Sequence, residues 1–134
     1  MVCFEHENLD KNQLQKTLEH FNWGAAIYTW LWGLGNGCFR KTWIVLVLHA
    51  FMWIPIINII LLLANIGLMI YYGIKGNEWA YEGRAWWNLE DFEATQKRWA
   101  VAAAVTVGII AAMLLFYILL FGAVVAFGAM GGSN

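Results

Sequence analysis

Charge is scarce in this chain of 134 residues: 8 basic and 9 acidic residues lie outside two long uncharged stretches, residues 42–74 and 99–134. A soluble domain of this size has too little interior to bury both stretches, whereas about 20 apolar residues suffice to span a bilayer. Hydrophobic residues make up 61% of the chain and charged residues only 13%, far from the balance of an ordinary soluble domain. The composition therefore predicts an all-α integral membrane protein with one membrane domain over residues 1–134.

Other scarcities exclude whole classes of function. The single serine, Ser133, lies in the C-terminal tail with no base to activate it, which argues against a serine hydrolase. Cys3 and Cys38 are far apart and no histidines pair at metal-ligand spacing, so we expect reduced thiols and no metal or cofactor. Clustered Lys and Arg are missing, so we expect no nucleic-acid partner. The first 20 residues hold no apolar run, so we expect no cleaved signal peptide. Together these absences predict a protein that is not an enzyme.

Residues 8–34 carry one apolar stripe at alternating gaps of four and three residues, which is typical of a helix. Its members are Leu14, Leu18, Phe21, Ala25, Tyr28 and Trp32. Before Phe21 the other faces are polar, and after it almost every face is apolar. We therefore expect one helix that begins amphipathic at the surface and becomes embedded in the membrane, until the "GLGNG" segment ends it.

The apolar segment 43–72 contains Pro55, the one proline of the chain. As a helix this segment would reach about 45 Å, too long for one close-fitting crossing of a hydrocarbon core of about 30 Å and too short for two. Three topologies remain open: a single kinked crossing, three full spans that include residues 21–39, or a re-entrant hairpin bent near Pro55. The hairpin is favoured, because it places all eight Lys and Arg residues on one side.

Residues 73–98 form a polar connection rich in aromatic residues, which precedes a transmembrane helix over residues 99–122 and a flexible tail over 123–134. Gly73 and Gly76 are expected to end the apolar helix, with Asn77 as the cap of the next segment. Asn88 is expected to cap a helix that runs on into the transmembrane helix. Within that helix, Ala100, Ala104, Gly108 and Ala112 repeat every four residues, a small-residue stripe that favours close packing of another helix.

Asn58 and Asn65 are seven residues apart in the apolar segment and share a helix face. Intramembrane polar groups often mark a pathway for ions or solutes. Their simpler role is to tie helices together by hydrogen bonds. We favour the simpler role, because the apolar runs contain no carboxylate or lysine for coupled transport.

Three sequence motifs resemble those of a known protein family. The segments "FNWGAAIYTWLWGLGNG", "GIKGNEWAY" and "FEATQKRWA" follow each other in this order over residues 21–100. This arrangement resembles a family of small, uncharacterised bacterial membrane proteins with FNWGAF, WGxGN and KGNEWAW motifs, although Tyr81 stands where the family often has tryptophan. The resemblance implies a protein of the bacterial cytoplasmic membrane whose connection 73–98 faces the cytoplasm.

The motif residues suggest a docking surface or a clamp for a lipid headgroup, made by Asn22, Trp23, Gly76, Asn77, Glu78 and Trp79. The leading hypothesis is an accessory or scaffold subunit of a membrane assembly, which contacts lipid and either other membrane subunits or further copies of itself. The alternative is a small oligomeric transporter or channel lined by Asn58 and Asn65.

Overall fold

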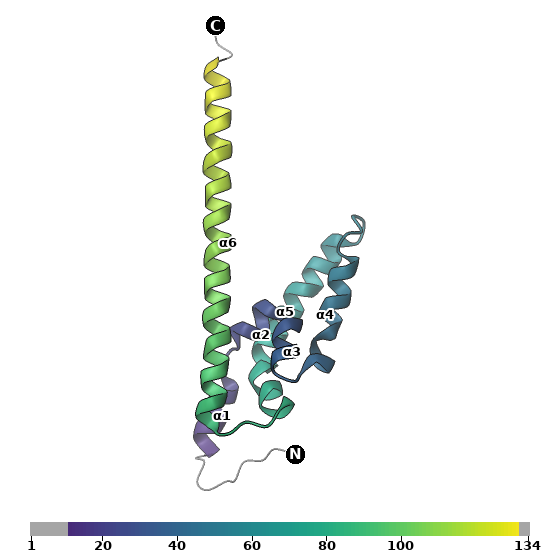
Figure 1. Cartoon of the computed structure of the whole chain (residues 1–134). Helices are drawn as coiled ribbons and strands as arrows, with labels where there is room; N and C mark the ends of the chain where they lie inside the picture. The colour runs from purple at the N-terminus through teal and green to yellow at the C-terminus, as the bar shows by residue number, and fades with distance from the viewer. Residues whose placement is uncertain (1–10, 132–134) are drawn as a thin grey trace. The chain divides into compact units, whose positions relative to one another are not determined.

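The computed structural model describes residues 11–131, with side chains up to residue 128, and its regular elements there are all α-helices (Figure 1). In chain order they are α1 (Lys11–Glu19), α2 (Trp23–Tyr28), α3 (Trp30–Gly35), α4 (Phe39–Phe51), α5 (Asn58–Gly83) and α6 (Leu89–Gly131). Contacts divide the chain into two compact units, Met1–Ala103 and Ala104–Asn134, so that α6 begins in the first and ends in the second. The segments Asn58–Gly83 and Leu89–Gly128 are long and apolar enough to cross a membrane.

The single helix predicted for residues 8–34 is wrong, because the described part of this segment contains α1, α2 and α3. Asn22 breaks it first: its backbone is extended, its Oδ1 accepts from Ala25 N at 2.9 Å, and its own N donates to Gly73 O at 2.7 Å. Thr29 breaks it again with φ 44° and ψ −102°. The predicted stop is confirmed, since α3 ends at Gly35 and Gly37 follows with φ 72°.

Helices α4 and α5 run antiparallel on either side of a bend at residues 52–57, which includes Pro55. Three contacts join them at increasing distance from the bend: His49 to Asn65 at 2.7 Å, Lys41 O to Tyr72 OH at 3.3 Å, and Lys41 Nζ to Glu82 Oε2 at 2.9 Å. The bend predicted at Pro55 is therefore present.

Helix α5 does not end where the sequence predicted. It passes through Gly73, Gly76 and Asn77 without a break and ends at Gly83, so the polar connection shortens to residues 84–88. These glycines do not end the helix; they allow other residues to pack closely against it. A Cβ on Gly73 would collide with the Phe21 ring, and one on Gly76 would lie 2.6 Å from Ala25 Cβ. Asn77 is thus an interior helix residue that faces α2, and the prediction that it is a cap is wrong.

Helix α6 begins as predicted, with Asn88 Oδ1 accepting from Asp91 N at 2.7 Å. It continues unbroken for 43 residues, about 65 Å at 1.5 Å per residue. The flexible tail predicted from residue 123 is wrong as far as Gly131, because these residues are helical, and residues 132–134 lie outside the described part.

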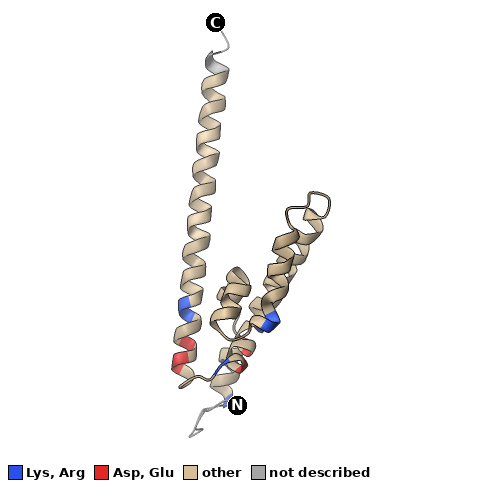
Figure 2. Ribbon diagram, turned by 45° about the vertical axis from the view of Figure 1, so that its right-hand side comes forward, with Lys and Arg blue, Asp and Glu red and all other residues tan. Residues whose placement is uncertain are grey.

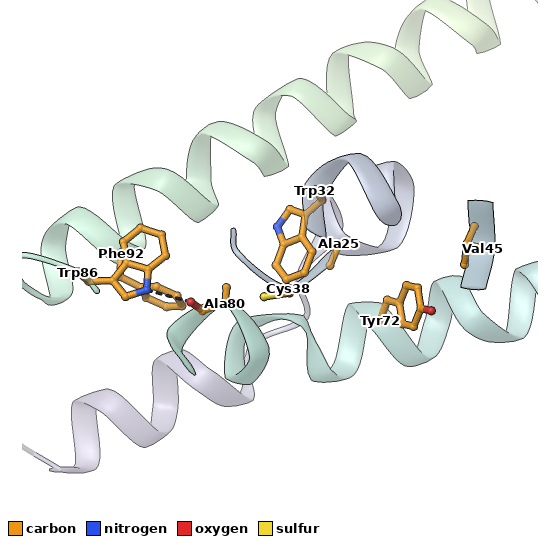
Figure 3. Packing of buried hydrophobic residues seen from close by; sticks show 8 residues of the cluster. All are labelled: Ala25, Trp32, Cys38, Val45, Tyr72, Ala80, Trp86 and Phe92. Atoms are coloured by element: carbon orange, nitrogen blue, oxygen red, sulfur yellow. Dashed lines mark hydrogen bonds between the residues drawn. The ribbon is translucent and has the colours of Figure 1, made fainter. Parts of the chain in front are cut away.

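The core of the first unit joins segments that are far apart in sequence. Figure 3 shows Trp32 beside Ala25 and Cys38, and Trp86 against Phe92. The Trp86 and Phe92 rings meet edge to face with centroids 5.1 Å apart, and Trp86 Nε1 donates to Ala80 O at 2.9 Å. This core fixes the start of α6 on the end of α5.

Candidate functional site

Four side-chain amides and one indole meet inside the first unit, and we call them the amide network: Asn22, Trp32, Asn36, Asn77 and Gln96. Asn22 Nδ2 donates to Asn77 Oδ1 at 2.7 Å and to Gln96 Oε1 at 2.9 Å. Trp32 Nε1 donates to the same Gln96 oxygen at 3.1 Å, while Gln96 Nε2 donates to Asn36 Oδ1 at 2.8 Å. The network therefore links α2, α3, α5 and α6 through one chain of hydrogen bonds.

Four members of the amide network are buried, and the fifth, Gln96, is half-buried. Asn22, Asn36, Asn77 and Trp32 are each at most 5% exposed. Among the described residues, no buried side-chain nitrogen or oxygen lacks a hydrogen-bond partner. Buried polar groups that are all satisfied specify one arrangement of helices, since any other arrangement leaves some of them unpaired. The network is thus a positioning device that gathers all three sequence motifs.

Asn77 extends the network to α1. Its Nδ2 donates to Thr17 O at 3.1 Å and to His20 O at 2.7 Å, carbonyls that the helix end leaves without an intrahelical partner. Thr17 Oγ1 also donates to Glu93 Oε1 on α6 at 2.6 Å. Asn77 therefore caps the C-terminus of α1 from α5.

Glycines bring α6 close to the network. A Cβ on Gly24 would lie 2.5 Å from Trp99 Cβ, and one on Gly35 would lie 2.7 Å from the Trp99 ring. The Trp99 ring also meets the Tyr28 ring edge to face at 5.5 Å. Gly24 and Gly35, both in the segment "FNWGAAIYTWLWGLGNG", are therefore needed for α2 and α3 to receive Trp99.

A cleft of about 740 Å³ opens beside the amide network, between α1 and the first turns of α6. Asn22, Asn77 and Gln96 of the network are among its lining residues. Its lining also includes charged and aromatic side chains: Lys16, His20, Trp23, Glu90, Glu93 and Lys97. The cleft is thus polar, of mixed charge, and next to the amide network.

The six residues predicted as a docking surface are divided by the structure. Asn22, Trp23 and Asn77 line the cleft. Gly76 packs against Ala25.

Glu78 and Trp79 are engaged elsewhere. Glu78 pairs with Lys75 at 2.7 Å, and the Trp79 ring meets the Tyr71 and Tyr72 rings at 5.5 Å. Three of the six predicted residues therefore line the cleft, and the other three do not.

Asn58 and Asn65 have different environments. Asn65 is 6% exposed and its Nδ2 lies 2.7 Å from His49 Nε2 on α4. Asn58 is at the first position of α5, and its side chain makes no such contact with α4. Asn65 therefore ties α5 to α4, the simpler role expected for it.

Cys38 is buried at the start of α4, with Sγ 2.9 Å from Trp79 O and 3.2 Å from Asn36 O. Desolvation by burial raises the pKa of its thiol to about 11, against a smaller opposing effect of Lys41. The thiol is therefore protonated at neutral pH and serves as a donor, not as a nucleophile. The predicted thiol at Cys3 lies outside the described residues. Within residues 11–131, no three side chains of the His, Cys, Asp or Glu type gather as metal ligands.

The small-residue stripe continues along α6. Ala104, Gly108 and Ala112 are exposed in the second unit, and apart from its own helix nothing lies within 4 Å of a Cβ placed on Gly108. Ala100 belongs to the first unit and lines the cleft.

Sequence reasoning missed three members of the amide network: Trp32, Asn36 and Gln96. The pattern around Asn36 indicates only a helix stop, and Gln96 lies in a segment whose adjacent residues, Thr95 and Lys97, are polar, so it was taken as solvated. The sequence did contain a signal for these buried amides, because each quoted motif has an amide side chain close to a small or aromatic residue.

Comparisons of the chain with models of protein families, with curated protein sequences and with solved structures find no match, so the resemblance of its motifs to a membrane-protein family stays a prediction.

Proposed function

We propose that this chain is an integral membrane protein that acts, without catalysis, as an accessory or scaffold subunit of a membrane assembly. The observation that supports this most is an inversion of polarity within the first unit. Its amide network is buried, whereas apolar side chains at the bend are exposed: Trp53 by 89%, Ile56 by 91% and Ile59 by 73%. Such an arrangement is costly in water and favourable in lipid.

The dimensions of α4 and α5 suit a hairpin that enters and leaves by the same face. Uncharged residues 42–51 of α4 rise about 15 Å, and uncharged residues 58–74 of α5 rise about 25 Å. The α4 arm is only about half the roughly 30 Å of a hydrocarbon core; α5 as a whole is long enough to cross, but its uncharged part alone falls short of that thickness. Figure 2 shows Lys and Arg at the base of α4 and none at the bend. We therefore place the bend inside the bilayer, and Arg40 and Lys41 among the headgroups.

The positive-inside rule then assigns the base of the hairpin and residues 73–98 to the cytoplasmic face, because all eight Lys and Arg residues lie on that side. The motifs of the chain resemble those of a bacterial membrane-protein family, so the membrane we propose is the bacterial inner membrane. Helix α6 crosses it once from residue 99 onward.

Cysteine labelling tests this topology. In a chain with Cys3→Ser and Cys38→Ala, a membrane-impermeant maleimide is expected to label Arg40→Cys and Ala85→Cys from the same side, since both lie at the hairpin base. Ile56→Cys is expected to react only after denaturation in detergent, because lipid covers the bend. Labelling of positions 40 and 85 from opposite sides would show that residues 43–72 cross the membrane.

The accessory role rests on the stripe of α6, which invites a close helix partner. Substituting Gly108→Leu is expected to lower recovery of the partner subunit in mild detergent about tenfold, equivalent to about 1.4 kcal/mol. Ala102→Leu, on another face of α6, is the matched control and is expected to leave recovery unchanged.

Two results would contradict the accessory role. One is a purification in which both variants and the original chain recover only this chain. The other is solute or ion movement by the protein reconstituted alone, abolished by Asn58→Leu without loss of folding, which would establish the transporter alternative.

A further inference from the structure

We propose that the cleft between α1 and the first turns of α6 binds the headgroup of a zwitterionic phospholipid that carries a phosphate and a primary ammonium group. This inference rests on the membrane attachment proposed above and adds a specific ligand to it. The cleft is lined from both sides: Lys16, Thr17 and His20 from the α1 side, and Glu90, Glu93 and Lys97 from α6. Its volume of about 740 Å³ is in the range of small-molecule sites.

The order of charges along α6 matches the order of groups in such a lipid. From the uncharged run that begins at Trp99, the cleft-lining charges are Lys97, then Glu93, about 6 Å further along the axis, then Glu90. In the lipid, the acyl chains are followed by the phosphate and then by the ammonium. Lys97 is therefore placed for the phosphate, and the two glutamates for the ammonium.

The charged groups are available for a ligand. The ion pairs among residues 11–131 are Lys41 with Glu82 and Lys75 with Glu78, and neither pair lines this cleft. Lys16, Glu90 and Lys97 are exposed. Glu93 accepts one hydrogen bond, from Thr17 at 2.6 Å, and a carboxylate has further acceptor sites.

The two ends of the cleft differ in polarity in the way that a lipid headgroup requires: one end adjoins the uncharged part of α6, and the other carries the carboxylates. Ala100 and Trp23 line it where α6 becomes uncharged, and Trp23 is 59% exposed, as suits an indole at the headgroup level. Carboxylates accept hydrogen bonds from a primary ammonium, whereas a quaternary ammonium donates none and is bound by aromatic cages. Glu90 and Glu93 therefore favour the primary ammonium.

The amide network gives the cleft its rigidity. Asn77 holds the end of α1, and Gln96 lies between Glu93 and Lys97 on α6 with its amide bonded to Asn36. Both walls are thus attached to the same buried group, so the spacing of Lys16 and Lys97 is set before a ligand arrives. A site arranged in advance loses less free energy on binding.

Lipid binding to the full chain in detergent micelles tests the proposal, with native mass spectrometry as the readout. Phosphatidylethanolamine is expected to bind about tenfold more tightly than phosphatidylcholine or phosphatidylglycerol of the same acyl chains. Lys97→Gln is expected to weaken its binding about tenfold. Glu90→Gln is expected to reduce the preference over phosphatidylglycerol. Arg98→Gln, which removes a charge next to the cleft but outside its lining, is the control and is expected to change neither.

Equal binding of the three lipids, or an equal effect of Lys97→Gln and Arg98→Gln, would overturn the proposal. Water-soluble phosphoethanolamine that binds as tightly as the lipid would overturn the lipid as the source of the ligand. Each variant is compared at an unchanged thermal midpoint. Lys16→Gln replaces Lys97→Gln, and Glu93→Gln replaces Glu90→Gln, where the first choice fails this criterion. Recovery of the chain in the membrane fraction, measured separately, distinguishes failure of this site from failure of the membrane attachment.

Discussion

Replacing Gln96 by leucine is expected to lower the free energy of unfolding of the first unit by about 4 kcal/mol. Gln96 accepts from Asn22 and Trp32 and donates to Asn36. Leucine fills a similar volume but offers no partner, so the Trp32 Nε1–H and the Asn36 side-chain oxygen Oδ1 lose theirs. Both residues are 0% exposed, so water cannot take the place of the lost bonds without opening the core.

Thermal unfolding in detergent, followed by circular dichroism, measures the effect of Gln96→Leu. A loss of about 4 kcal/mol corresponds to a midpoint lower by about 15 °C or more in a unit of this size. Gln96→Glu is expected to have an intermediate effect, because it keeps the two acceptor contacts and loses the donor to Asn36. Arg98→Leu, exposed on the same helix, is the control. A midpoint for Gln96→Leu equal to that of Arg98→Leu would show that the amide network does not hold the helices together.

Local signals were sufficient for the parts of the fold that depend on a few neighbouring residues. Pro55 lacks an amide hydrogen and marked the bend. Gly37, with its left-handed backbone, marked the stop after α3, and Asn88 marked the start of α6. Each feature has a cause within about one helical turn, so a single sequence contains it.

The errors concern residues whose conformation depends on distant partners. Gly73 and Gly76 resemble helix stops, but they lie within α5 because Phe21 and Ala25 occupy the space where their side chains would be. Asn22 interrupts a good helical stripe because its backbone N–H is bonded to Gly73, 51 positions away in the chain. Periodicity carries no information about such partners.

The candidate site was predicted only in part, because its contacts also depend on residues that are distant in the sequence. Asn22 and Asn77 were placed on one surface by their motifs, and the structure joins them at 2.7 Å. Gln96 was overlooked because an amide in a charged helical segment looks solvated. Only the approach of Asn36 and Trp32 makes it the centre of the network.

The second large effect is expected where two backbones cross, at Gly37 and Gly83. A Cβ on Gly83 would collide with the backbone oxygen of Asn36 and lie 2.7 Å from Cys38 Sγ, and a Cβ on Gly37 would collide with the backbone oxygen of Gly83. Gly83→Ala and Gly37→Ala are each expected to lower the free energy of unfolding by about 3 kcal/mol, because backbone atoms must move apart and a packed core resists such movement. For Gly37→Ala, the positive φ of 72° adds about 1 to 2 kcal/mol.

Two controls separate the crossing from ordinary effects of glycine. Gly67 lies in the same helix as Gly83 with nothing within 4 Å of its Cβ position, so Gly67→Ala is expected to raise stability by about 0.5 to 1 kcal/mol. Asparagine tolerates a positive φ, so Gly37→Asn would restore stability if backbone strain were the main cost. We expect no such rescue, because the asparagine Cβ meets the same oxygen. Thermal midpoints of the four variants measure this: a stable Gly37→Asn or Gly83→Ala protein would show that the end of α5 does not pack on the turn after α3.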